Sequence, residues 1–250
     1  MSGHSKWSQI KRQKGVNDSK RGAVFTKIGR EISIAARQGG GDPDANYRLR
    51  LAMDTARAAN MPADNIKRAI EKAVGGGAAE QDEEIVYEGY GPGGVAILVE
   101  TATNNKNRTA ADVRSIFVKA GGSLAGAGAV AWQFEQRGMI AVAREGHDPD
   151  ELALAAIDAG AEDVDAETDP MEVVTDSGRL ESVRKALEAA GVKVESAEVI
   201  MQPKSTVEVD DSHVRSNMRL IESLEDHDDV QRVTANFDIP DDVLAEAASA

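Results

Sequence analysis

The glycine triplet at residues 75–77 separates two parts of the chain that follow different hydrophobic patterns. Before it, apolar residues recur every three or four positions, as at Ile66, Ile70 and Val74, which is the spacing of one helix face. After it, short β-rich runs alternate with helical segments. The two patterns together predict an α+β fold. Because a run of glycines ends a helix, the triplet marks the end of a small N-terminal helical domain over residues 1–76.

Three helices are predicted in this first part. The first covers about 22–37, where Ile28 and Ile32 share one side of a helical wheel, and the glycines at 39–41 end it. Ile34 falls among the basic residues on another side, so the two faces of this helix are not cleanly separated. Residues 1–21 lack periodicity and are expected to form an extended arm.

The second and third helices have sequence signals at their ends. The second is expected over about 43–60, with Asp42 in the cap position and Pro43 in the first turn, where both residue types are favoured. The third is expected over about 62–74, after the break made by Pro62. Together with the first helix they would bury one shared apolar core.

The part after the triplet carries strand and helix signals in a repeating order. Strand-like runs at 84–90 and 95–101 flank a Gly-Pro-Gly-Gly turn, which predicts a hairpin. The other expected elements are a helix at about 107–120, strands at 129–135 and 139–143, a helix at 149–159, strands at 163–167 and 172–175, a helix at 178–190, strands at 193–201 and 206–209, a helix at 212–224 and a strand at 230–237. From 139 to 201 the order is βαββαβ, as in a ferredoxin-like unit.

The elements after residue 203 cannot enclose a core alone. Added to the βαβ of residues 95–135, they complete a second βαββαβ set. The expected architecture is therefore an N-terminal helical domain followed by two ferredoxin-like (βαββαβ-type) domains, one inserted into the other. The expected boundaries are 1–76 for the helical domain, 77–137 plus 204–240 for a discontinuous middle domain, 138–203 for the inserted domain and 241–250 for a frayed tail.

Charge is distributed very unevenly along the chain. Residues 1–76 carry 15 Lys/Arg against 7 Asp/Glu, a net +8, which leaves −22 for the rest of a chain whose net charge is −14. A basic head on an acidic body is typical of a protein that binds a polyanion, because Lys and Arg that neutralise phosphates release counterions. The alternative is a basic tail that only solubilises the chain or folds back on its own acidic body.

Residue content argues against several classes of site. The chain has no cysteine, which excludes disulfides, thiolate metal sites and cysteine nucleophiles and favours a reducing cytoplasm. Its four histidines lack metal-ligand spacing, and the Glu225–Asp229 cluster is interpreted as a solvated charged turn. No apolar run is long enough to span a membrane. No small-molecule substrate is evident, and we expect no catalytic residue, no metal and no cofactor, in a chain that is not an enzyme.

Two glycine-rich runs and one polar run remain as candidate binding segments. The glycines at 89–94 and 121–128 lack the strand, loop and helix order that cradles phosphate, so each is interpreted as a structural turn. The run from Asn104 to Thr109 lies between a strand and a helix, with Asn107 as the expected N-cap. It is either a capped, solvated loop or a partner surface formed by Asn105, Asn107 and Arg108.

Several longer motifs resemble one known family. They are Met1-Ser2-Gly3-His4-Ser5-Lys6-Trp7, Arg21-Gly22, Arg30-Glu31-Ile32, Gly41-Asp42-Pro43, Asn60-Met61-Pro62, the run from Tyr87 to Gly94, Asn107-Arg108-Thr109 and Asp228-Asp229-Val230-Gln231. Together they are similar to the YebC/PmpR family, which includes bacterial transcriptional regulatory proteins and the mitochondrial translational activator of cytochrome c oxidase. The chain departs from the family pattern at Asn104, where the family has Asp, and at Ala125, where it has Gly. The fold of that family is similar to the one expected above.

The resemblance implies a cytoplasmic, non-enzymatic, nucleic-acid-binding regulator of gene expression. In one reading it is a transcriptional regulatory protein that binds DNA through its basic N-terminal part. In the other it is a ribosome-associated translation factor that binds ribosomal RNA and relieves stalling on proline-rich sequences. The partner is thus nucleic acid or the ribosome, and a monomer is favoured. The residues expected to contact nucleic acid are Lys6, Trp7, Lys11, Arg12, Lys14, Lys20, Arg21, Lys27, Arg30, Arg37, Arg48 and Arg50.

Overall fold

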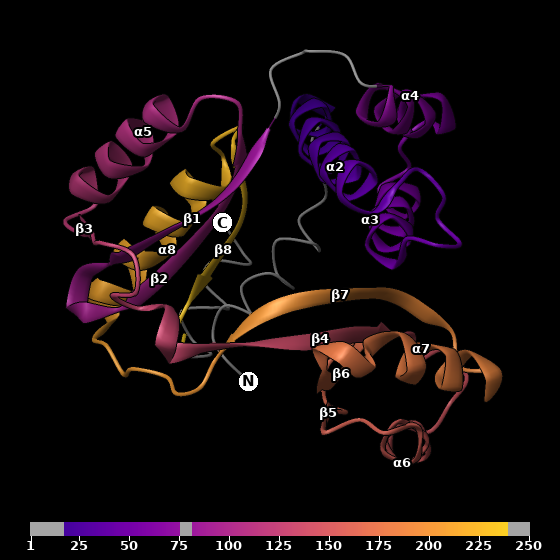
Figure 1. Cartoon of the computed structure of the whole chain (residues 1–250). Helices are drawn as coiled ribbons and strands as arrows, with labels where there is room; N and C mark the ends of the chain where they lie inside the picture. The colour runs from indigo at the N-terminus through magenta and orange to yellow at the C-terminus, as the bar shows by residue number, and fades with distance from the viewer. Residues whose placement is uncertain (1–17, 76–81, 240–250) are drawn as a thin grey trace.

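The computed structural model describes residues 18–75 and 82–239, with side chains described from residue 22. Figure 1 shows three groups of elements: a helical region, and two sheets that lie at an angle to each other. The α+β fold expected from the sequence is confirmed, since helices come first and two antiparallel four-stranded sheets follow. We call them sheet A, in the order β3-β1-β2-β8, and sheet B, in the order β5-β6-β4-β7.

The elements have the following bounds. The helices are α2 (Asp18–Gly39), α3 (Tyr47–Ala58), α4 (Ala63–Val74), α5 (Lys106–Lys119), α6 (Pro149–Ala159), α7 (Leu180–Ala189) and α8 (Asp211–Glu225). The strands are β1 (Glu83–Tyr90), β2 (Ala96–Thr103), β3 (Ser123–Leu124), β4 (Phe134–Val142), β5 (Asp163–Asp165), β6 (Met171–Asp176), β7 (Val194–Pro203) and β8 (Val230–Ala235). Short 3₁₀ turns are η1 (Pro92–Gly94), η2 (Ala131–Gln133) and η3 (Ser177–Arg179).

The helical region packs α2, α3 and α4 around one apolar core. Ile28 and Ile32 are buried there, as the helical spacing predicted, together with Leu49 and Ala56 of α3. Ile34 is only 4% exposed, although it lies among basic residues on another side of α2. Helix α2 is therefore buried on more than one side, which explains why its sequence does not divide into one apolar and one polar face.

The start of α3 differs from the prediction. The helix begins at Tyr47 rather than at Pro43, and its N-cap is Asn46, whose side-chain oxygen accepts from the backbone N–H of Leu49 at 3.1 Å. The Asn46 amide also donates to the carbonyls of Ala35 and Gly40, both at 2.8 Å. Asn46 is favoured over Asp42 as the cap because it satisfies the end of α2 and the start of α3 with one buried side chain.

Sheet A begins with the predicted hairpin. Strands β1 and β2 pair in register from Glu83 with Thr103 to Tyr90 with Ala96 across the η1 turn, in which Gly93 adopts the left-handed backbone conformation. Strand β8 pairs with the other edge of β2, and β3 pairs with β1. Helices α5 and α8 bury Phe117 and Ile221 against the strands in one shared core.

Sheet B has the βαββαβ order that was predicted, formed by β4, α6, β5, β6, α7 and β7. The two sheets share a layout: a central strand, β4 or β2, has two neighbours, and a short strand closes one edge. In sheet A, however, the place that corresponds to β6 is taken by β1, which precedes the central strand. The predicted strand at 206–209 is therefore wrong as a sheet strand, because β1 fills that position and only Val207 forms an isolated bridge, to Phe237.

The predicted strand at 129–135 is also wrong. Residues 131–133 form the turn η2, and the strand that follows, β4, runs from Phe134 into sheet B, where Phe134 pairs with Pro203. The strand that closes sheet A is β3, within a segment that was expected to be only a glycine-rich turn. The composition of the segment could not distinguish a turn from the strand β3, because a strand of two residues forms wherever the edge of another strand is available for pairing. The domain boundaries proposed from the sequence stay a prediction.

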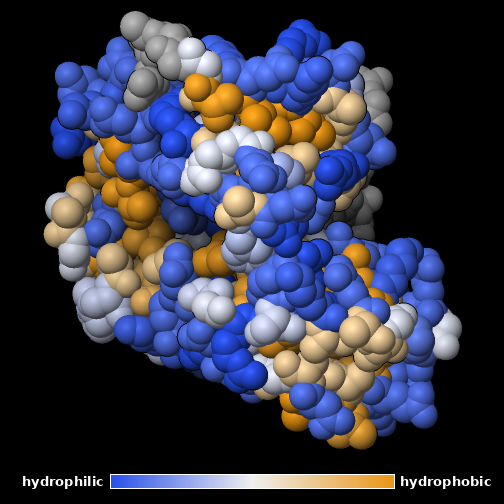
Figure 2. All heavy atoms as spheres, turned by 45° about the vertical axis from the view of Figure 1, so that its right-hand side comes forward, coloured by the Kyte–Doolittle hydropathy of each residue, from blue (hydrophilic) through white to orange (hydrophobic). Residues whose placement is uncertain are grey.

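The helical region contacts both sheets. Tyr47 and Leu51 of α3 pack against the apolar core of sheet B, while α2 reaches sheet A through Arg30. In the part of the chain that the structure describes, no helix has the length and apolar character needed to cross a membrane. On the face drawn in Figure 2, hydrophilic residues dominate and hydrophobic ones gather in separate patches.

Candidate functional site at the junction of helix α2 and sheet A

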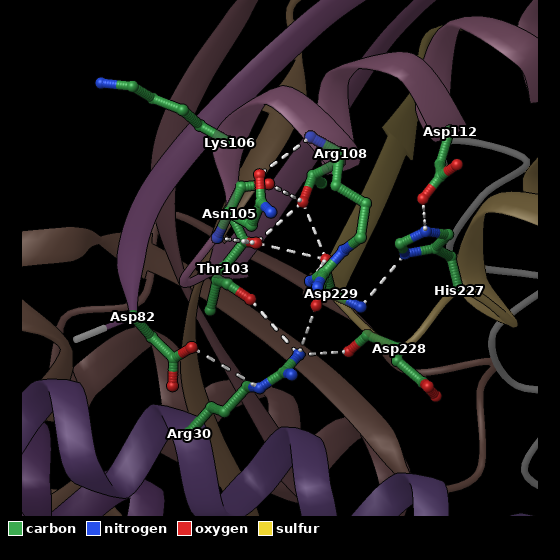
Figure 3. A network of polar contacts seen from close by, with 12 residues as sticks. Arg30, Asp82, Thr103, Asn105, Lys106, Arg108, Asp112, His227, Asp228 and Asp229 are labelled. Carbon is green, nitrogen blue, oxygen red and sulfur yellow. Dashed lines mark hydrogen bonds and ion pairs between the residues drawn. The ribbon is translucent and has the colours of Figure 1, made fainter. Parts of the chain in front are cut away.

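A buried carboxylate, Asp229, lies where α2, α5 and β8 meet (Figure 3). It is 2% exposed and comes directly before β8. Its Oδ1 accepts from Arg30 Nη1 at 3.0 Å, and its Oδ2 accepts from Arg108 Nη2 at 2.7 Å. Arg30 also donates to the carbonyls of Asp228, at 2.7 Å, and Ala102, at 3.3 Å. One guanidinium thereby joins the helical region to sheet A.

Two threonine hydroxyls complete the surroundings of this carboxylate. Thr109 Oγ1 lies 2.7 Å from Asp229 Oδ2 and 2.8 Å from Thr103 Oγ1, and both threonines are buried. Thr103 ends β2, and Thr109 lies in the first turn of α5. The N-cap Asn105 accepts from Arg108 N–H at 3.1 Å, which fixes the start of α5 and so places Arg108 and Thr109 beside Asp229.

The electrostatics keep Asp229 ionised. Burial alone would raise the pKa of Asp229, but hydrogen bonds from Arg108 and Thr109 and the charge of Arg30 together hold that pKa below its ordinary value. An ionised carboxylate in this position satisfies two guanidinium groups at once. Arg30 contacts Oδ1, whereas Thr103, Arg108 and Thr109 all lie at Oδ2, so both oxygens of the carboxylate are engaged by side chains of the same molecule.

An open hollow of about 490 Å³ lies beside this carboxylate. Its lining consists of Arg30, Arg108, Asp112, Asp226, His227, Asp228 and Asp229. His227 Nδ1 accepts from the backbone N–H of Asp229 at 3.1 Å, which leaves Nε2 facing Asp112 at 3.4 Å. Among the described residues, no three His, Asp or Glu side chains are grouped so as to hold a metal ion. The hollow is a polar junction that can accept hydrogen-bonding groups.

Most of the residues predicted to contact nucleic acid lie outside the description. Lys6, Trp7, Lys11, Arg12 and Lys14 lie outside the described residues, and the side chains of Lys20 and Arg21 are not described either. Their role stays a prediction based on sequence charge and on the family resemblance.

The five described residues of that set all have partners within the chain. Lys27 donates to the carbonyl of Glu225, and Arg37 donates to that of Asp82 at 3.2 Å. Arg30 binds the Asp229 carboxylate, as described above.

Helix α3 supplies the other two cations of the set. Arg48 forms an ion pair with Glu84 of β1, and Arg50 pairs with Glu181 of α7 at 3.0 Å. In this structure each of the five cations contacts a residue after position 81, so all five link the helical region to the acidic remainder of the chain.

The polar run after β2 has a mixed outcome. Asn105, not Asn107, is the N-cap of α5, because Thr103 and Asn105 are the residues at which the strand turns into the helix. Asn107 is exposed, and Arg108 is half exposed while it binds Asp229. A partner surface formed by these residues stays a prediction.

Sequence reasoning missed Asp229 itself. The Glu225–Asp229 cluster was expected to be a solvated turn, but its last residue is buried, because Arg30 and Arg108 approach from distant parts of the sequence. The available signal was the pair of motifs Asn107-Arg108-Thr109 and Asp228-Asp229-Val230-Gln231, whose charges are complementary.

Comparison with known proteins assigns the family. Residues 5–76 match a model described as the TACO1/YebC protein N-terminal domain, and residues 82–237 match the TACO1/YebC second and third domain. A protein of Rubrobacter xylanophilus named "Probable transcriptional regulatory protein" is 52% identical over 249 residues, which cover 99% of this chain and 100% of that protein. One of Roseiflexus castenholzii with the same name is 54% identical over 254 residues, with 100% of both chains covered.

A solved structure shows the same architecture. The crystal structure of the conserved hypothetical protein Aq1575 from Aquifex aeolicus superposes with a TM-score of 0.84 at 44% sequence identity. The match covers 89% of this chain and 92% of that one. Sequence and fold agree across the helical region and both sheets, so this chain belongs to the TACO1/YebC family.

Proposed function

We propose that this protein is a non-enzymatic regulator of gene expression that binds nucleic acid through its basic N-terminal part. The observation that carries the proposal is the charge distribution, +8 over residues 1–76 against −22 over the rest. A polyanion is attracted to the first part and repelled by most of the second, so the main binding surface lies at one end of the molecule. The names of the relatives, which describe transcriptional regulatory proteins, support the regulatory role and favour DNA as the target.

The partners of the described cations sharpen this proposal. Arg30, Arg48 and Arg50 each bind an acidic side chain of the same molecule, and a phosphate would have to displace that side chain. Residues 1–21 contain six more Lys/Arg and one acid. We therefore assign most of the phosphate contacts to Lys6, Lys11, Arg12, Lys14, Lys20 and Arg21, and a mainly structural role to Lys27, Arg30, Arg37, Arg48 and Arg50.

A binding measurement tests this function. We expect purified protein to bind a labelled DNA duplex with an affinity that falls as salt is added, because phosphate contacts release counterions. The Lys11→Ala/Lys14→Ala variant should bind more weakly on every sequence tried. Unchanged affinity in this variant, with the same dependence on salt, would refute the proposed role of the N-terminal segment.

A second experiment separates transcription from translation. Lysate of cells that express the protein is sedimented through a sucrose gradient, with and without nuclease and at two salt concentrations. Transcriptional regulation predicts that the protein sediments with chromosomal DNA and is released by deoxyribonuclease. Sedimentation with ribosomal particles that deoxyribonuclease does not change would instead favour the translation-factor alternative.

A further inference from the structure

A tryptophan side chain lies on the surface beside sheet A, away from the Asp229 junction. Trp132, in the turn η2, is 67% exposed, although burying so large an apolar ring is favourable. Tyr90, at the end of β1, is also on the surface. Neither ring is used in the junction or in the apolar cores.

Both rings are held in place by one carbonyl. Trp132 Nε1 donates to Ala129 O at 3.1 Å, and the Tyr90 hydroxyl donates to the same oxygen at 3.1 Å. The two aromatic side chains are thereby brought to the same loop with fixed orientations. A ring that is already ordered loses little conformational freedom when it binds a partner.

A buried carboxylate fixes this loop from below. Glu88 accepts from the backbone N–H groups of Gly128, Val130 and Ala131 at 2.6 to 2.8 Å. Burial would raise the pKa of Glu88, but these three donors hold it below its ordinary value. The backbone that leads into Trp132 is therefore anchored, and the exposure of the ring is a property of an ordered turn.

The loop that carries the ring is uncharged and lies next to one ammonium group. Residues 121–134 contain no charged side chain, in a protein in which 29% of residues are charged. The Lys204 Nζ donates to Trp132 O at 2.9 Å. The loop thus has no charged side chain of its own: the Lys204 ammonium group lies against it, and the Glu88 carboxylate is buried under it and bound by three backbone N–H groups.

We propose that Trp132, with Tyr90 and Lys204, is a stacking site for an unpaired base of single-stranded nucleic acid. The indole would stack on the base, since every base has a flat face that an aromatic ring can cover, and Lys204 would pair with a neighbouring phosphate. Because only two rings take part, this is a single contact that supplements the basic N-terminal segment. The inference rests on the proposed function and adds a preference for unpaired strands.

Fluorescence tests the site directly, because the chain has only two tryptophans. In a Trp7→Phe background, all tryptophan emission comes from Trp132. Titration with an unlabelled uridine oligonucleotide of about 12 nucleotides should quench that emission, and a duplex of equal length should quench it less. Binding without any change in emission would overturn the proposal.

Affinity measurements on a labelled oligonucleotide complete the test. In the wild-type background, Trp132→Ala should weaken binding roughly ten-fold, while Trp132→Phe, which keeps a ring, should retain most of the affinity. Ile157→Ala is the matched control, since Ile157 is 56% exposed on α6 of sheet B. Equal affinity of Trp132→Ala and Ile157→Ala would also overturn the stacking site.

The outcomes separate this inference from the proposed function. If Lys11→Ala/Lys14→Ala weakens binding and Trp132→Ala does not, the stacking site is refuted and the basic N-terminal site stands. If the wild-type protein binds neither oligonucleotide nor duplex at low salt, the proposed function fails, and the inference that rests on it fails with it.

Discussion

The helical region is attached to the two sheets in two different ways. At sheet A, Arg30 of α2 binds Asp229, whose side chain is 3% exposed. At sheet B, Arg50 of α3 binds Glu181, whose side chain is 23% exposed and which also pairs with Arg184 and Lys185. A buried charge that loses its partner is costly, whereas a partly exposed carboxylate with other partners loses little. The comparison indicates that the ion pair at sheet A contributes more to stability than the ion pair at sheet B.

Removal of the two carboxylates should give the largest contrast. Asp229→Ala is expected to lower the free energy of unfolding by about 3–5 kcal/mol, because two guanidinium groups and two threonine hydroxyls lose their acceptor. Glu181→Ala should cost about 1 kcal/mol or less. Urea denaturation of both variants measures the difference, and similar losses would show that burial does not distinguish the two attachments.

The dependence on pH should sharpen the same contrast. The pKa of Asp229 is lowered in the folded state, so its stabilising contribution is present above the unfolded pKa of about 3.9 and is lost as the pH falls through the folded pKa. The stability difference between wild type and Asp229→Asn should be full at pH 7 and should shrink below about pH 4. A difference that stays constant to pH 2 would contradict an ionised carboxylate.

A smaller effect of opposite sign is expected at Glu100, on β2. Burial raises the pKa of Glu100, and the charge of Arg232 offsets this only in part. Its charged form therefore opposes folding at neutral pH, and this cost is relieved as the pH falls through the folded pKa. Glu100→Gln should raise the melting temperature slightly at pH 7 and less at pH 5. A lower melting temperature at pH 7 would show that the pair with Arg232 matters more than burial.

Elements defined by neighbouring residues were predictable from the sequence. The hairpin of β1 and β2 was predicted because two strand-like runs flank a Gly-Pro-Gly-Gly turn, and α4 because its apolar residues keep helical spacing between Pro62 and Gly75. Both signals act over a few residues. The βαββαβ order of sheet B followed from the same kind of information.

Features that depend on distant residues were not predictable. Asp229 lies in an acidic turn that seemed solvated, and it is buried because Arg30 approaches from 199 positions earlier in the chain. The strand expected at 206–209 has suitable residues, but β1 already occupies the position between β2 and β3. In both cases a segment far away in the sequence decided the outcome: Arg30 as a partner of Asp229, and β1 as the occupant of the strand position. The local sequence pattern carries no information about such distant segments.

The central claim is that two sets of cations have different tasks: those of residues 1–21 bind nucleic acid, and Lys27, Arg30, Arg37, Arg48 and Arg50 hold the molecule together. The direct test compares two charge-matched variants, Lys11→Ala/Lys14→Ala and Arg48→Ala/Arg50→Ala, in duplex binding across a range of salt concentrations. Lys11→Ala/Lys14→Ala should make the negative slope of log affinity against log salt shallower by about 2 units. Arg48→Ala/Arg50→Ala should leave this slope unchanged. Equal losses of slope in both variants would contradict this division of tasks.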